Sequence, residues 1–212
     1  MHDPIILFIH VLIGSIGLIG GITSLVTVKG GKPHKIGGWI FIFGMLVSVI
    51  TTLRFMADEF LPLAVVMCIA TIYLMGSSIT AIRNNKKWAR VIDFLLLLFP
   101  LALFIFPLMS IVRTLPGVSM VTVGQSTISL TFLYCLIEDI KYLRSIPLSR
   151  NVVIARHLFR MILAFTFGVM AVIRIGVKVD IIDLEYSVII PLIFGFIIAI
   201  RTKKQKINLP PS

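Results

Sequence analysis

Three histidines in or beside strongly apolar stretches are the residues best suited to chemistry in this 212-residue chain: His10, His34 and His157. An imidazole nitrogen can bind haem iron, and an imidazole can also hydrogen-bond to the oxygen of a quinone. The same side chains can instead act only as hydrogen-bonding links between membrane helices. The sequence leaves both interpretations open.

Small residues follow the first of these histidines at steps of three and four. Gly14, Gly17, Gly21 and Ser24 fall on the same face of an α-helix as His10, since such a helix turns about 100° per residue. This face predicts close packing against another membrane helix, because small residues let two backbones approach. It could alternatively receive a flat ring such as a porphyrin or a quinone.

The composition indicates the solvent in which these residues lie. The chain is 58% hydrophobic and only 14% charged, whereas soluble domains are about 45–50% apolar and about 25% charged. Its apolar runs are continuous, as in membrane helices of about 20 residues, and do not alternate as barrel strands do. We expect an all-α integral membrane protein, a bundle of seven transmembrane helices in a single domain, 1–212. The predicted spans are 5–28, 36–57, 60–82, 91–112, 117–137, 152–175 and 186–200, with a basic tail at 201–212.

The distribution of charge predicts the orientation. The net charge of +11 would suggest nucleic acid in a soluble protein, but here the basic residues gather on one side of the predicted membrane. The positive-inside rule then predicts an external N-terminus and a cytoplasmic C-terminus in the inner membrane. We expect the basic loops to meet anionic lipid headgroups and expect no nucleic-acid partner. The bases assigned to the cytoplasmic side are Lys29, Lys32, Lys35, Arg83, Lys86, Lys87, Arg90, Lys141, Arg144, Arg150, Arg201, Lys203, Lys204 and Lys206.

This topology limits which histidines can share a metal ion. His10 lies five residues from the outer end of its predicted helix, and His157 lies five residues from the inner end of its own. They are therefore roughly 15 Å apart in depth in a bilayer core of about 30 Å, too far for one iron. His34 and His157 both lie near the cytoplasmic face. They form the candidate metal-binding pair, and we expect a common partner for the two rings, whether a metal or a polar plug.

Charged residues within the spans need a compensating contact, because each costs about 2.5–3.5 kcal/mol at the centre of a membrane helix. Arg160 lies deepest, and we expect an ion pair between it and Asp93 or Glu138. Arg156, Glu138 and Asp139 lie nearer helix ends. For these three we expect side chains that reach water or cap a helix.

Other chemistry finds little support. The sequence has no HExxH zinc motif, no GxSxG elbow, no phosphate-binding loop and no lysine in the middle of the last span. Cys68 and Cys135 are predicted at different depths, so no disulfide is expected. Nothing here predicts a stand-alone enzyme.

Three segments resemble a known family: "IHVLIGSIGLIGG", "KPHKIGGWIF" and "RNVVIARHLFRMILAFTFGVMAVIRI". Together they are similar to a prokaryotic multi-pass membrane family, the "domain of unknown function 2306" family. The resemblance covers both ends of the chain and implies no established activity. Arg160 departs from it, since an aromatic residue would be expected there. The residues that carry the resemblance are His10, Gly14, Gly17, His34, Lys35, Gly37, Gly38, His157, Met161 and Arg174.

These observations favour a membrane redox or ligand-binding module that holds haem b or a quinone-like group between the helices at 5–28, 36–57 and 152–175. A redox partner would then be needed. The alternatives are a structural or accessory membrane protein, in which the histidines only join helices, and a small-molecule transporter. The expected ligand-binding residues are His10, His34, His157, Gly14, Gly17, Gly21 and Arg160, with His34 and His157 as the metal ligands.

Overall fold

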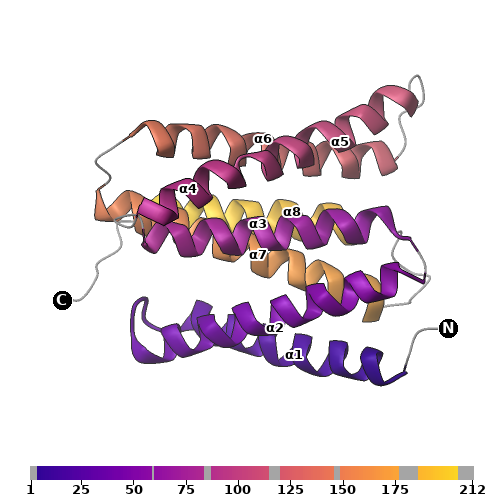
Figure 1. Cartoon of the computed structure of the whole chain (residues 1–212), viewed down its shortest axis with the longest axis horizontal. Helices are drawn as coiled ribbons and strands as arrows, with labels where there is room; N and C mark the ends of the chain where they lie inside the picture. The colour runs from indigo at the N-terminus through magenta and orange to yellow at the C-terminus, as the bar shows by residue number, and fades with distance from the viewer. Residues whose placement is uncertain are drawn as a thin grey trace. The chain divides into compact units, whose positions relative to one another are not determined.

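A computed structural model of the chain describes residues 4–58, 60–83, 87–114, 120–145, 149–176 and 186–204. All regular structure in these residues is α-helical, which confirms the all-α part of the predicted fold class (Figure 1). The helices of the described residues are α1 (Pro4–Val26), α2 (Lys32–Met56), α3 (Pro62–Ile82), α4 (Lys87–Leu96), α5 (Leu98–Thr114), α6 (Met120–Arg144), α7 (Arg150–Gly176) and α8 (Tyr186–Lys204).

Among the described residues, five helical stretches are long and apolar enough to cross a membrane: α1, α2, α3, α7 and the stretch formed by α4 with α5. α8 is also apolar, although its apolar part is shorter. Several predicted boundaries differ from the structure, among them the start of α2, which lies at Lys32 rather than at residue 36. α6 continues to Arg144, past the predicted end at residue 137, and α8 continues to Lys204, so the predicted tail begins as helix.

The predicted span 91–112 is two helices separated by Leu97. Pro100 explains the interruption, because it has no N–H to donate to the carbonyl of Leu96, four residues earlier. The backbone N–H of Leu97 instead bonds to the carbonyl of Phe94 at 3.2 Å, which tightens the turn. The break leaves α4 as a short helix that carries Asp93.

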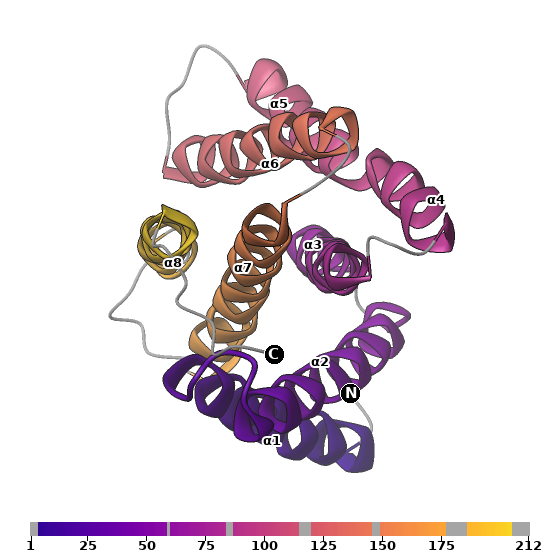
Figure 2. The same ribbon diagram turned by 90° about the vertical axis from the view of Figure 1, so that its left-hand side faces the viewer.

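The chain forms two compact units, whose boundary falls inside α3. Unit 1 comprises Met1–Ile72 and Lys206–Ser212, and unit 2 comprises Tyr73–Gln205. In unit 1, α1 and α2 lie side by side and antiparallel, as the short connection between them predicts (Figures 1 and 2). Gly30 in that connection has φ = 79°, a conformation that favours glycine.

In unit 2, α7 packs on α8, α5 packs on α6, and α6 also contacts α4 and α8. Part of its core is a row of aromatic rings. The centroid of Phe132 lies 6.1 Å from that of Tyr73 and 5.8 Å from that of Phe167. α7 and α8 approach so closely at Gly195 that a side chain there would collide with Thr166.

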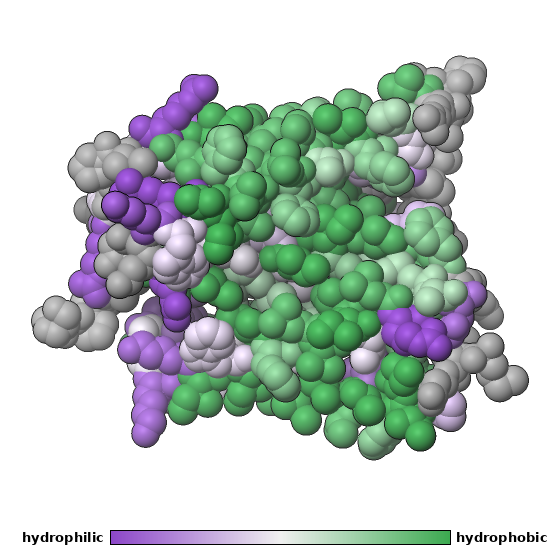
Figure 3. All heavy atoms as spheres, viewed as in Figure 1, coloured by the Kyte–Doolittle hydropathy of each residue, from purple (hydrophilic) through white to green (hydrophobic). Residues whose placement is uncertain are grey.

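The side chains show the reverse of a soluble protein's pattern. Ile19, Phe43 and Phe94 are each more than 60% exposed, whereas the Arg160 side chain is 1% exposed. Over α1 and α2 the surface is hydrophobic along the helices, and hydrophilic residues gather toward their ends (Figure 3). An apolar surface of this kind suits hydrocarbon better than water.

Candidate functional site: a buried cluster of aspartates and arginines

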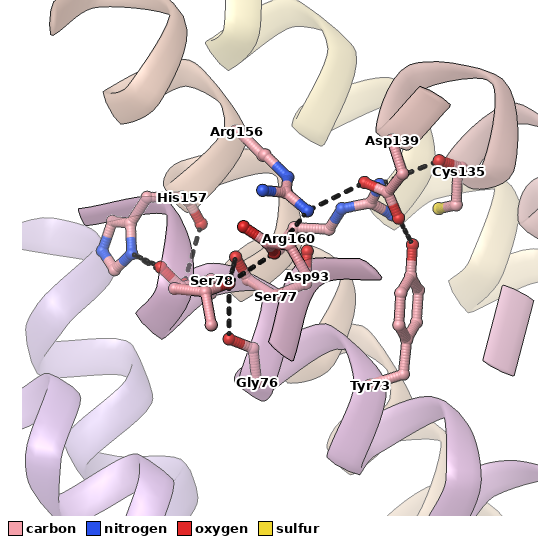
Figure 4. A network of polar contacts seen from close by, with 11 residues as sticks. Tyr73, Gly76, Ser77, Ser78, Asp93, Cys135, Asp139, Arg156, His157 and Arg160 are labelled. Atoms are coloured by element: carbon pink, nitrogen blue, oxygen red, sulfur yellow. Dashed lines mark hydrogen bonds and ion pairs between the residues drawn. The ribbon is translucent and has the colours of Figure 1, made fainter. Parts of the chain in front are cut away.

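Four charged side chains meet inside unit 2: Asp93 of α4, Asp139 of α6, and Arg156 and Arg160 of α7 (Figure 4). We call them the acid–arginine cluster. Arg156 Nη2 lies 3.0 Å from Asp93 Oδ1 and 3.1 Å from Asp139 Oδ1, and Arg160 Nη2 lies 2.6 Å from Asp139 Oδ1. Two positive and two negative charges therefore balance at a place that is nearly closed to solvent.

The helices explain why these residues meet. Arg156 and Arg160 are four residues apart, so they lie on one face of α7 and can both reach Asp139. Asp139 is available because α6 continues beyond the apolar part of its sequence. The short α4 supplies Asp93 from the other side of Arg156.

Neutral donors from α3 complete the hydrogen bonding of both carboxylates. The Tyr73 hydroxyl donates to Asp139 Oδ2, and the Thr80 hydroxyl donates to Asp93 Oδ1 at 2.6 Å. Each carboxylate thus accepts from an arginine and from a hydroxyl. Such pairing is what makes a buried charge tolerable, since an unpaired one would cost several kcal/mol.

The guanidinium groups are less completely satisfied. Arg160 Nη2 also donates to the carbonyl oxygen of Cys135 at 3.0 Å, and the Cζ of Arg156 lies 3.8 Å from the ring centroid of Tyr142. However, Nε and Nη1 of both arginines are buried and have no hydrogen-bond partner. A buried donor without a partner costs about 1–3 kcal/mol, and more when it is charged. The cluster can therefore donate further hydrogen bonds, although its positive and negative charges already balance.

His157 adjoins this cluster on α7 (Figure 4). Its Nδ1 lies 2.6 Å from the Ser78 hydroxyl and 3.2 Å from the Ser78 carbonyl oxygen, both on α3. Two of the sequence-predicted residues, His157 and Arg160, thus belong to one polar region of unit 2.

The other two histidines lie at opposite ends of the α1–α2 pair. His10 Nδ1 lies 2.7 Å from Thr51 Oγ1, and His34 Nδ1 lies 2.9 Å from the Ser24 carbonyl oxygen. Ser24 is about 21 Å along α1 from His10, at 1.5 Å per residue, so these two rings cannot share a metal ion. His34 and His157 belong to different units, so their approach stays a prediction. Within the described ranges, no group of three or more His, Cys, Asp or Glu residues could hold a metal ion.

The glycine face of α1 packs directly on α2. A Cβ added to Gly17 would lie 3.1 Å from the Cα of Gly44, and one added to Gly14 would lie 2.9 Å from Ser48 Oγ. Gly21 is buried as well. This is the close packing that small residues predict, and a flat ring between these helices at Gly17 would have to displace α2.

Two predictions about the charged residues are wrong. Arg156 and Asp139 were expected to reach water, but their side chains are only 8% and 2% exposed. Arg160 pairs with Asp139 rather than with Asp93 or Glu138. These predictions used only the depth of each residue along its own helix. That depth takes no account of partners on other helices. The detectable signal was the spacing of the two arginines, four residues apart in an apolar helix.

No family model, no curated protein and no solved structure matches this chain. The resemblance to the "domain of unknown function 2306" family therefore stays a prediction.

Proposed function

We propose that this chain is a multi-pass membrane protein and that the acid–arginine cluster binds a small ligand through oxygen atoms that accept hydrogen bonds. The observation that carries the proposal is the set of four buried guanidinium nitrogens, two on Arg156 and two on Arg160, that have no partner. A carboxylate and a quinone carbonyl share the required chemistry, since both accept from N–H groups.

The charge of the cluster favours the neutral ligand. Two aspartates and two arginines already balance. A carboxylate would add a negative charge to a nearly dry site, and its desolvation would have to be offset there. A quinone carbonyl adds no charge and uses the spare donors. The quinone-like group expected from the sequence is thus assigned to helices α3, α4, α6 and α7 rather than to the glycine face of α1.

The test is ligand-dependent thermal stability of the purified full-length chain in mild detergent. The two probes are a short-chain ubiquinone and octanoate. A probe that binds only the folded state stabilises it by about 2.7 kcal/mol at a hundredfold excess over its Kd. We expect this with the ubiquinone, and we expect Arg156→Lys to abolish it, because lysine lacks the planar fork of donors.

Arg54→Lys is the matched control, since Arg54 forms an exposed ion pair with Asp58 outside the cluster. It should leave the effect of the ubiquinone unchanged. If octanoate stabilises the protein and the ubiquinone does not, the ligand is an anion and not a quinone. Two results would contradict ligand binding: no change in thermal stability with either probe, or the same stabilisation of Arg156→Lys and the parent by ubiquinone. The cluster would then serve only to join helices.

A second candidate is the haem predicted from His34 and His157. In each, Nδ1 faces a backbone carbonyl oxygen, that of Ser24 or of Ser78. A metal-ligating histidine commonly donates its other ring N–H to a carbonyl of this kind. The Ser24 and Ser78 hydroxyls also lie 3.0 Å and 2.6 Å from these two Nδ1 atoms. A Soret band in the purified protein that His34→Ala and His157→Ala each remove would support this candidate, and a colourless protein would exclude it.

The proposal includes seven spans, with the N-terminus outside and the C-terminus in the cytoplasm. The charge distribution supports this orientation. Cysteine substitutions should be labelled in intact cells at Asp180 only, and at Lys86 and Lys203 only after permeabilisation. Both native cysteines are buried, so background labelling should be low. Labelling of Lys86→Cys from outside would overturn the topology.

A further inference from the structure

A shallow groove runs along the α1–α2 pair. The residues that line it lie far from the acid–arginine cluster in the sequence. Its volume is about 570 Å³. Gly20 and Gly37 form its floor, where α1 and α2 are so close that a Cβ on Gly20 would lie 2.8 Å from the Gly37 carbonyl oxygen. The other lining residues are Ile16, Ile19, Thr23, Lys32, Pro33, Ile36 and Ile40.

The groove has the length of one membrane leaflet. On α2 it extends from Lys32, the first residue of the helix, to Ile40, which is about 12 Å at 1.5 Å per residue. On α1 it ends at Ile16, near the middle of Pro4–Val26. Half of a bilayer core is about 15 Å. The groove therefore runs from the membrane boundary to near its midplane.

Positive charge lies at the boundary end. The connection between α1 and α2 carries Lys29, and the first turn of α2 carries Lys32 and Lys35. The Lys29 ammonium donates to the carbonyl oxygens of Ser24 and Leu25 at the end of α1. Lys32 is the lysine that lines the groove.

We propose that this groove holds one acyl chain of an anionic glycerophospholipid, with the phosphate beside Lys32. The apolar walls match the chain, and the lysine matches the phosphate. A partner transmembrane helix would cross both leaflets, whereas this groove is only long enough for one. The proposal requires that the chain lie in a membrane, but it does not depend on what the acid–arginine cluster binds.

The experiment is native mass spectrometry of the full-length protein. The protein is equilibrated in detergent with equal amounts of phosphatidylglycerol and phosphatidylcholine that have the same acyl chains. We expect one retained lipid, predominantly phosphatidylglycerol. Lys32→Gln should lower the ratio of the two retained lipids about fivefold, since a lysine near lipid phosphate contributes about that factor. Lys35→Gln removes the same charge three residues away, outside the groove lining, and should leave the ratio unchanged.

A second pair of variants tests the apolar walls. Thr23→Phe puts a ring into the groove and should reduce retention of both lipids severalfold. Ile22→Phe puts the same ring on an exposed position of α1 that does not line the groove, and it should retain lipid like the parent. Both variants should keep the parent's thermal stability without added lipid.

Two results would overturn the proposal. One is an equal loss of phosphatidylglycerol preference in Lys32→Gln and Lys35→Gln, which would show only a diffuse attraction to the basic turn. The other is full retention in Thr23→Phe, which would place the bound lipid elsewhere. Neither result bears on quinone binding by the cluster, so failure of this proposal and failure of the proposed function can be told apart.

Discussion

The α1–α2 pair and the acid–arginine cluster join helices in opposite ways. In the pair, backbone lies against backbone at Gly17 and Gly44. In the cluster, Asp139 accepts from two arginines of another helix while all three groups are buried. At Gly17 and Gly44 the helices approach because neither residue has a side chain, whereas the cluster needs all four of its charged side chains.

This difference should appear in how each interface responds to substitution. Removing one member of a buried charge network leaves the others uncompensated, so the loss is concentrated in single residues. A glycine contact is damaged by adding atoms, and the damage depends on what the new atom meets.

Asp139→Ala should have the largest effect. Arg156 and Arg160 would lose their shared carboxylate, and we expect a loss of about 3–5 kcal/mol in the free energy of unfolding. The measurement is unfolding by a denaturing detergent titrated into a mild one. Glu138→Ala is the control, because Glu138 adjoins Asp139 in the sequence but is partly exposed, and it forms an ion pair with Lys141 of its own helix, at 3.7 Å, outside the cluster. Equal losses in the two variants would mean that the cluster does not hold unit 2 together.

Gly44→Ala should come next, with a loss of about 1–3 kcal/mol. The new Cβ would lie 2.6 Å from the Cα of Gly17, and backbone cannot move aside as a flexible side chain can. Gly38→Ala is the matched control in the same helix, since its Cβ would meet only Ser24 Oγ, at 3.7 Å. It should be neutral or slightly stabilising. If both variants unfold like the parent, α1 and α2 do not pack through these glycines.

Thr51→Val should cost about 0.6 kcal/mol, a typical value for a hydrogen bond between membrane helices. It removes the hydroxyl that bonds to His10 across the α1–α2 interface. Thr52→Val provides the comparison, because the Thr52 hydroxyl donates only to the Ser48 carbonyl of its own helix. Comparable stability of the two variants would show that the histidine contact contributes nothing.

Arg54→Gln should have the smallest effect. Its ion pair with Asp58 has good geometry at 3.0 Å, but both side chains are exposed, and exposed pairs four residues apart contribute about 0.3–0.5 kcal/mol. The same titration measures it. A loss as large as that of Asp139→Ala would mean that burial is not what distinguishes the cluster from an ordinary ion pair.

The sequence predicted the helices and the glycine interface well. Apolar runs locate helices because the lipid core requires about 20 apolar residues, and a stripe of small residues lies within one helix where periodicity reveals it. The break at Leu97 was missed because a proline within an apolar run leaves hydropathy unchanged. It could have been found from Pro100 alone.

The cluster was only partly predictable. Arg160 was singled out correctly as needing a partner, but hydropathy ended the fifth span at residue 137, although the helix continues to Arg144. Asp139 was therefore assigned to the membrane boundary. Its burial depends on side chains that approach from α3 and α7, and no pattern within one helix contains that information.

The order of the cluster along the chain has a consequence for biosynthesis. Asp93 is made 63 residues before Arg156, and Asp139 is made 21 residues before Arg160. At about 5–20 residues per second, the two acids must wait roughly 3–13 s and 1–4 s for their arginines. Their hydroxyl partners are already made, since Thr80 precedes Asp93 and Tyr73 precedes Asp139. Each carboxylate is thus synthesised after its neutral donor, and its arginine partners are synthesised last.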